Sequence, residues 1–190
     1  MIATVTEIKT LLQISGSTYD TLIGSMVVPT QDWLVNHLKN AFLDSHIWYT
    51  ASTIAFTAST ITDSESKFVE SDFVAGDYLI EGSKYQQSEN RGRIVGVSTV
   101  AAGTLTLNST YYTAYPLIAE TAENSVTLTR VCFPNGLKLP FARLIQFDMS
   151  TRDKSLTSRS LADYSESYAG EGDYPPGLLR KLAPWKRVYW

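Results

Sequence analysis

The chain has 190 residues, of which 44% are apolar and 18% charged, and its formal net charge is −3. This composition is typical of a globular protein, and the length suits one domain or a small domain carrying a second as an insert. The mildly acidic balance argues against a surface that grips nucleic-acid backbone, which requires clustered lysine and arginine. No signal peptide and no apolar run of membrane-spanning length are recognised, so we expect a soluble protein made in a reducing cytoplasm.

Residues 4–44 carry helical patterns. A short helix is expected with Thr4 or Thr6 as its N-cap, because apolar residues follow at three- and four-residue spacing. A turn at residues 15–18 ends this helix, and Asp20 is expected to cap a longer one. Pro29 lacks a backbone donor, so the longer helix is expected to kink or restart there. The apolar positions are Val5, Ile8, Leu11, Leu12, Leu22, Ile23, Met26, Val27, Trp33, Leu34, Leu38, Ala41 and Phe42.

Residues 47–133 differ in character, because threonine, serine and glycine become frequent and helical spacing disappears. Short alternating runs separated by turn residues indicate strands. The expected strands are residues 54–57, 67–68, 78–81, 93–98, 104–108 and 125–131. Strands of this length and spacing favour a small antiparallel barrel or sandwich inserted between helices.

Residues 134–190 return to helical spacing. Leu137, Phe141, Leu144, Ile145 and Met149 form a stripe that requires a helical partner. An extended C-terminal arm and a short helix that begins at Pro175 follow. The predicted fold is α+β: a small helical bundle formed by the N- and C-terminal segments (1–46 and 134–190), with an inserted antiparallel β barrel or sandwich (47–133).

Candidate catalytic residues are few. His37 and His46 are the only histidines, and neither has a ligand at metal-binding spacing on the same helix face. Cys132 is the only cysteine, which excludes an internal disulfide and a cysteine zinc site. Its apolar neighbours Val131 and Phe133 predict a buried, inert thiol.

Carboxylates are concentrated in one polar stretch of the insert, but their spacing fits no calcium loop. They are expected to form a solvated rim. No nucleophile elbow, phosphate loop or dinucleotide fingerprint occurs. We therefore expect a protein that is not an enzyme and that uses no cofactor or metal. The carboxylates are Asp63, Glu65, Glu70, Asp72 and Asp77.

The C-terminal part is rich in the residue types that carry binding energy. Tryptophan, tyrosine and arginine dominate protein interfaces, and a chain end frays unless something holds it. Two interpretations stay open: Trp185 and Trp190 pack on their own core, or the segment docks on a neighbouring subunit or partner. The candidate partner-binding residues are Tyr164, Tyr168, Tyr174, Leu178, Leu179, Leu182, Trp185, Lys186, Arg187, Tyr189 and Trp190.

Several runs together resemble the head–tail adaptor (head-completion, or connector) proteins of long-tailed bacteriophages. The run Val5-Thr-Glu-Ile-Lys-Thr-Leu-Leu-Gln-Ile14, then Tyr19-Asp20 and a long helix, is similar to the opening of that family. Residues 158–168 look like its Ser-Glu-x-x-Gly-Asp-Tyr-Ser-x-x-Tyr run, with Leu161-Ala162 where a glycine often precedes Asp-Tyr. Tyr174-Pro175, the leucines after it and the basic, aromatic stop match its closing helix.

The insert resembles the β modules that some of these proteins carry. Its Phe68, Phe73 and Gly76-Asp77-Tyr78-Leu79-Ile80 follow the order of that module's pattern, as does the later run Asn90-Arg-Gly-Arg-Ile94. The resemblance therefore spans nearly the whole chain.

The resemblance implies a structural virion protein in the neck between capsid and tail. It would form a dodecameric ring that joins the portal protein after DNA packaging and extends the channel toward the stopper and tail. Residues 174–190 would reach the portal, and double-stranded DNA would pass without specific binding. One alternative is a stopper or tail-completion protein. Another is a carbohydrate-binding β module that stacks sugars on Trp48, Tyr49, Tyr111, Tyr112 and Tyr115.

Overall fold

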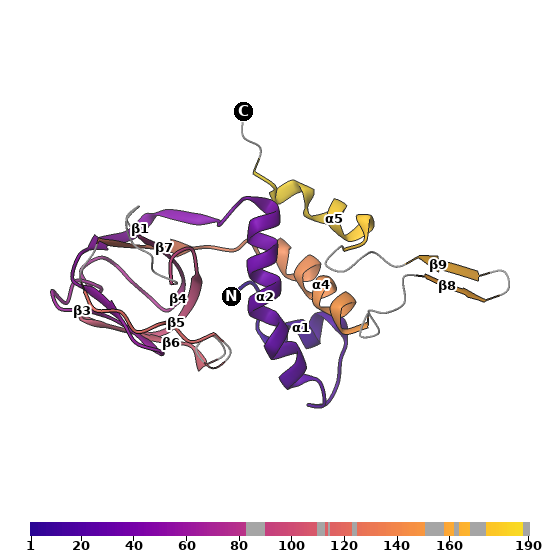
Figure 1. Ribbon diagram of the computed structural model, residues 1–190, viewed down its shortest axis with the longest axis horizontal. Coiled ribbons are helices and arrows are strands. Elements are labelled where there is room, and N and C mark those ends of the chain that lie inside the picture. The colour runs from indigo at the N-terminus through magenta and orange to yellow at the C-terminus, as the bar shows by residue number, and fades with distance from the viewer. Residues whose placement is uncertain are drawn as a thin grey trace.

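The computed structural model describes residues 1–82, 90–109, 113, 115–122, 125–150, 158–161, 164–167 and 174–187. Figure 1 shows a curled sheet on one side, a helical bundle in the centre and a β-hairpin on the opposite side. The α-helices of this part of the chain are α1 (Val5–Leu12), α2 (Asp20–Leu38), α4 (Lys138–Ser150) and α5 (Pro176–Leu182), with 3-10 turns η1 (Asn135–Leu137) and η2 (Ala183–Trp185). None of these helices has the length and apolar character needed to cross a bilayer.

The bundle core joins the two ends of the chain. Its buried members run from Ile2, ahead of α1, to Leu182 in α5, and both are 1% exposed. The expected packing of N-terminal against C-terminal helices is therefore present, and the α+β class is confirmed. The other buried side chains of this core are Ala3, Ile8, Ile23, Val27, Leu34, Leu38, Leu137, Phe141, Ala142, Leu144, Ile145 and Tyr174.

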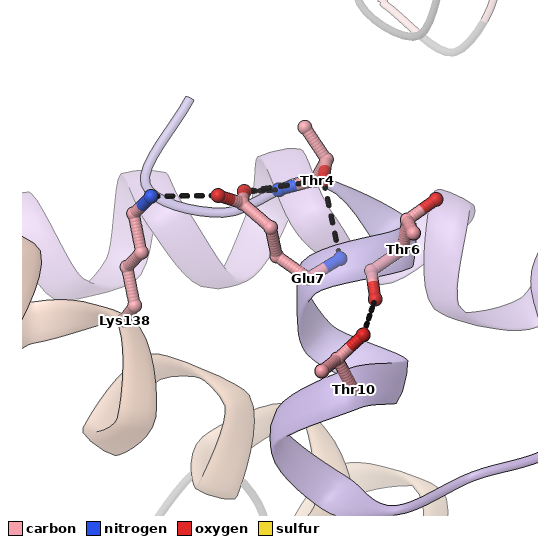
Figure 2. Close-up of polar contacts among 5 residues, drawn as sticks. All are labelled: Thr4, Thr6, Glu7, Thr10 and Lys138. Atoms are coloured by element: carbon pink, nitrogen blue, oxygen red, sulfur yellow. Dashed lines mark hydrogen bonds and ion pairs between the residues drawn. The ribbon is translucent and has the colours of Figure 1, made fainter.

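The start of α1 is a capping box that also contacts α4 (Figure 2). Thr4 Oγ1 accepts from the Glu7 N–H at 3.2 Å, and Glu7 Oε2 accepts from the Thr4 N–H at 2.8 Å. Lys138 Nζ lies 2.7 Å from Glu7 Oε1, so the first turns of α1 and α4 are joined by an ion pair. This bond, and next the Thr4 N–H, lower the pKa of Glu7. The prediction of Thr4 as an N-cap is confirmed.

Helix α2 differs from the prediction at its start. Tyr19 is the N-cap and makes no side-chain cap bond. Asp20 instead accepts from Lys9 Nζ at 2.5 Å, which ties α1 to α2. The helix continues through Pro29 without restarting, although a proline inside a helix costs about 3 kcal/mol. Buried residues on both sides of Pro29, including Val28 and Thr30, hold the helix by packing.

The sheet is antiparallel and open. Its strands are β1 (Leu43–Ala51), β2 (Ile54–Phe56), β3 (Thr60–Asp63), β4 (Gly76–Gly82), β5 (Ile94–Ala101), β6 (Thr104–Leu107) and β7 (Val126–Val131), in the order β1-β7-β4-β5-β6-β3-β2. The edge strands β1 and β2 are joined through Ser52 and Thr53 alone, so the sheet curls until its edges approach. No ladder joins those edges, so the sheet is not a closed barrel.

Two strands were missed and one expected strand is wrong. β1 and β3 had not been predicted, because β1 shows no clean alternation of buried and exposed residues. Residues 67–68 form a turn instead of a strand. The carboxylate of Asp63 organises this turn by accepting from the Lys67 N–H at 3.0 Å and the Glu65 N–H at 3.2 Å. Phe68 is nevertheless fully buried. The alternating pattern therefore gave the wrong backbone conformation for this residue.

The chain enters and leaves the sheet at one place. The Cys132 N–H donates to the Phe42 carbonyl at 2.9 Å, so both connections to the bundle run side by side. The sheet begins at Leu43, ahead of the boundary expected at residue 47. The bundle also contacts the sheet through the backbone nitrogen of Met1, which lies against the Asp77 carboxylate.

Candidate functional site

Two of the predicted partner-binding residues are buried in the bundle. The Tyr174 ring packs edge-on against Trp33, with ring centroids 4.4 Å apart, and its hydroxyl donates to Asp148 Oδ2 at 2.7 Å. Burial, and next the bond to Asp148, raise the pKa of Tyr174 well above its usual value. Leu182 is 1% exposed. In this structure both side chains stabilise their own bundle.

The rest of the C-terminal segment is held on the end of α2. Leu178, Leu179 and Trp185 are partly buried against the bundle core. The Trp185 carbonyl accepts from Asn40 Nδ2 at 3.2 Å, and the Arg187 N–H donates to the Leu38 carbonyl at 2.9 Å. Trp185 therefore folds back on its own core, which is one of the two interpretations left open by the sequence.

The Trp185 ring packs closely over Gly136. A Cβ added to Gly136 would lie 3.1 Å from Trp185 Cζ2, closer than most such contacts. Lys186 and Arg187, the last described residues, are exposed. Within the predicted basic and aromatic tip, Lys186 and Arg187 are the described residues whose side chains face solvent.

Of the remaining predicted residues, Tyr164 falls in a hairpin. The strands β8 (Ser158–Leu161) and β9 (Tyr164–Ser167) pair antiparallel, with Leu161 opposite Tyr164. An extended arm without defined strands had been expected between Ser150 and Pro175. The hairpin projects from the bundle on the side away from the sheet (Figure 1). Tyr168, Tyr189 and Trp190 lie outside the described residues.

A groove of about 1140 Å³ lies where the bundle meets the sheet. It is formed by the C-terminal end of α2, the link to β1, the first half of β1, β4, the residue after β7 and the C-terminal segment. We call it the junction groove. Its lining residues are Val35, Asn36, Lys39, Asn40, Ala41, Phe42, Leu43, Asp44, Ser45, His46, Leu79, Glu81, Cys132 and Arg187.

Asp44 is the most connected polar side chain of the junction groove. Its Oδ1 accepts from the His46 N–H and contacts His46 Nδ1, each at 3.1 Å. The His46 N–H, and next the His46 ring, lower the pKa of Asp44. On the other side, Cys132 Sγ lies 3.8 Å from Asp44 Oδ2. These contacts hold the wall of the groove at the start of β1.

Cys132 is exposed, so the prediction of a buried thiol is wrong. Val131 ends β7 with its side chain in the interior, and the next residue points the other way because side chains alternate along an extended chain. Apolar neighbours in sequence did not decide its burial. The strand register did.

Among the described residues, the contacts of the groove do not pair its thiol with an imidazole. Cys132 contacts a carboxylate rather than an imidazole, whereas a nucleophilic thiol needs a base that takes its proton. No group of three or more histidine, cysteine or carboxylate side chains in the described residues is arranged to hold a metal ion. His37 stacks on Trp33 at a centroid distance of 4.8 Å, away from any such group.

The aromatic set expected for sugar stacking is not one surface. Trp48 is 58% exposed, and Tyr49 beside it points to the other face of β1. The Tyr49 hydroxyl donates to Asp63 Oδ2 at 3.2 Å and its ring packs on Phe68, so it belongs to the sheet interior. Tyr115 is 41% exposed, in the connection after β6. Tyr111 and Tyr112 lie outside the described residues.

The expected solvated rim of carboxylates is only partly correct. Glu65, Glu70 and Asp72 are exposed. Asp63 is 3% exposed and also accepts from Thr53 Oγ1 at 2.6 Å, so it is a buried organiser of a turn. Asp77 faces Met1 at the junction with the bundle.

Sequence reasoning had missed the junction groove. Its lining comes from four separate stretches of the chain, and no motif links them. The one local signal is the polar run Asp44-Ser45-His46 between the end of a helix and the exposed Trp48. Comparison with protein families and with curated proteins finds no match for this chain.

Proposed function

We propose that this chain is a structural virion protein, a head–tail adaptor that docks on the portal ring after DNA packaging and extends the channel toward the stopper and tail. The observation that carries the proposal is the arrangement of projections around one bundle. The sheet and the β8–β9 hairpin leave the bundle on opposite sides, and α5 lies on a third (Figure 1). A subunit of a ring needs two opposite sides for its neighbours and a third for an axial partner.

The residues of the opening run have structural roles that fit a shared bundle. Thr4 and Glu7 form the cap of α1, and Glu7 reaches Lys138 on α4. Lys9 reaches Asp20 on α2. The run therefore joins three helices, and a family built on the same bundle would keep these residue types for that reason. This supports the resemblance at the level of fold.

The charge of the chain is compatible with a DNA channel. A net charge of −3 gives no general attraction for phosphate. DNA would slide past such a surface without being held, as passage into and out of the capsid requires. The exposed Lys186 and Arg187 are confined to the C-terminal segment, where we place the contact with the portal.

The test is negative-stain imaging and mass photometry of the purified protein, alone and mixed with a portal ring from the same source. We expect rings or a decorated portal. A chain that stays monomeric and ignores the portal would refute the adaptor role, and it would favour a protein that joins the tail later.

A pair of variants locates the contact. Lys186→Gln combined with Arg187→Gln should weaken portal decoration. Arg91→Gln combined with Arg143→Gln removes the same charge from exposed positions outside residues 174–190 and is the matched control. Equal loss in both pairs would indicate a general charge effect and would remove the C-terminal segment from the interface.

A further inference from the structure

The two edge strands of the open sheet differ in protection. β2 has three residues, and Phe56 exchanges backbone hydrogen bonds with Glu120 at 2.9 and 3.0 Å, which covers that edge. β1 has nine residues and pairs only with β7 in the described part of the chain. A long edge strand offers a row of backbone donors and acceptors to which another strand can add.

The first half of β1 departs from its ladder beside the junction groove. Leu43 pairs with Val131 and Trp48 pairs with Thr129, so β1 advances five residues while β7 advances two. The residues between these pairs form a wide bulge, and three of them (Asp44, Ser45 and His46) line the junction groove. Bulges of this kind redirect backbone and side chains and are frequent next to binding sites.

The junction groove suits a peptide segment. Its volume of about 1140 Å³ exceeds the range of roughly 300–1,000 Å³ typical of small-ligand pockets. Phe42, Leu43 and Leu79 contribute apolar surface. The lining also carries both signs of charge, with Lys39 and Arg187 as cations and Asp44 and Glu81 as anions.

The β8–β9 hairpin is a candidate for the strand that could add to the β1 edge. Its two strands pair with each other, from Ser158 opposite Ser167 to Leu161 opposite Tyr164. It lies on the far side of the bundle from the sheet, so the bundle separates it from the groove of its own chain (Figure 1). Its backbone register is regular, with Arg159 opposite Glu166, so each of its strands has one edge that β8–β9 pairing leaves available.

We propose that the β8–β9 hairpin of one copy docks in the junction groove of the next copy and adds a strand to the β1 edge. A contact between opposite sides of successive copies is heterologous, and such contacts generate rings or open filaments rather than closed dimers. Main-chain hydrogen bonds to β1 would supply the affinity, as when an extended segment adds a strand to an exposed sheet edge. The inference rests on the proposed function, because it assigns the subunit contact of the adaptor ring.

The lone cysteine makes the contact testable by disulfide trapping, since Cys132 is exposed in the groove. The first protein carries Cys132→Ser with Ser165→Cys in the hairpin, and the second is the natural chain. A parallel first protein carries Glu166→Cys instead, because adjacent strand residues present opposite faces. The matched control carries Cys132→Ser with Thr21→Cys, an exposed position at the other end of α2.

After mixing and mild oxidation, we expect crosslinked pairs of the two proteins to form at least about tenfold faster with one of the hairpin cysteines than with Thr21→Cys, because docking raises the effective concentration. Peptide mapping should place the bond at Cys132. Hairpin variants that crosslink no faster than the control would overturn the inference. So would rapid Cys132–Cys132 dimers of the natural chain, which would indicate two-fold pairing of β1 edges.

The assay contains no portal, so its outcome is separate from that of the adaptor role. A chain that crosslinks through the hairpin but ignores the portal keeps this subunit contact and loses the portal assignment. A chain that decorates the portal without hairpin crosslinks keeps the adaptor role and loses this contact.

Discussion

The helical bundle and the sheet differ in how far apart in sequence the residues of each core lie. The bundle core joins Ile2 to Leu182, whereas the buried core of the sheet runs from Ile54 to Leu128. Closing a long loop costs entropy before its contacts form, so the bundle depends on both chain ends being in place. The sheet core is contained in one continuous segment whose two ends meet at Phe42 and Cys132. The difference indicates that the sheet can be removed with less damage than either end.

The largest expected effect is that of a C-terminal deletion. Removing residues 174–190 takes Tyr174, Leu182 and Trp185 from the bundle and exposes the apolar faces that they cover. We expect loss of cooperative helical unfolding, measured by circular dichroism at 222 nm during heating. A shortened chain with an unchanged helical transition would show that the C-terminal segment is a detachable arm.

The reciprocal deletion is the control. Replacing residues 44–131 by a short Gly/Ser linker should leave the helices folded, because Phe42 and Cys132 are already adjacent. Loss of the helical signal in this variant would show that the contacts between bundle and sheet, such as Met1 with Asp77, are required for the bundle.

A pair of core truncations compares the two regions side chain for side chain. Leu182→Ala in the bundle and Leu128→Ala in the sheet each remove a leucine that is at most 1% exposed. Each should lower the free energy of unfolding by about 2–5 kcal/mol. If the regions are independent, denaturant titration will show Leu182→Ala shifting the helical transition alone. A single transition that moves equally in both variants would mean that the two cores unfold together.

A smaller effect, with a defined pH window, is expected at the cap of α1. The bond from Lys138, followed by the Thr4 N–H, lowers the pKa of Glu7 from 4.5. The stabilisation is therefore present above about pH 4.5 and is lost as the pH falls through the lower folded-state pKa. Both side chains are partly exposed, so Glu7→Gln should cost about 0.5–1 kcal/mol at pH 7 and little at pH 3. Chemical denaturation at the two pH values measures this, and an equal cost at both would contradict it.

The smallest expected effect lies between the two regions, at Asp32 on α2. Desolvation raises the pKa of this carboxyl from 3.8 to about 6, and the charge of Arg93 on the sheet side partly opposes the shift. Since the folded pKa is raised, stability should fall as the pH rises from about 4 to 6 and then stay level. Asp32 as a whole residue is exposed, so screening limits the effect to below about 1 kcal/mol.

The variant Asp32→Asn removes the titrating group. Its unfolding free energy should change less with pH between pH 4 and 6 than that of the natural chain. A natural chain that gains stability over this range while Asp32→Asn does not would reverse the sign of the assignment. Arg93→Gln is the companion variant, because it removes the charge that opposes the shift and should enlarge the fall.

The sequence by itself determined the elements whose signals are local. Apolar spacing predicted α1, with Thr4 or Thr6 as its N-cap, and the stripe of α4, and short alternating runs predicted most of the sheet. These features depend on residues within a turn or a strand of each other, which periodicity and capping chemistry describe directly. The α+β class follows from the same local signals.

Only the tertiary structure decided which side chains are buried and which surfaces stay exposed. Pro29 inside α2, the exposure of Cys132 and the burial of Tyr174 each depend on what packs against them rather than on their neighbours in sequence. The junction groove and the open β1 edge arise where α2, β1, β4 and the C-terminal segment meet. Such features are set by the register of strands and the faces that helices bury, and these are fixed only when distant parts of the chain come into contact.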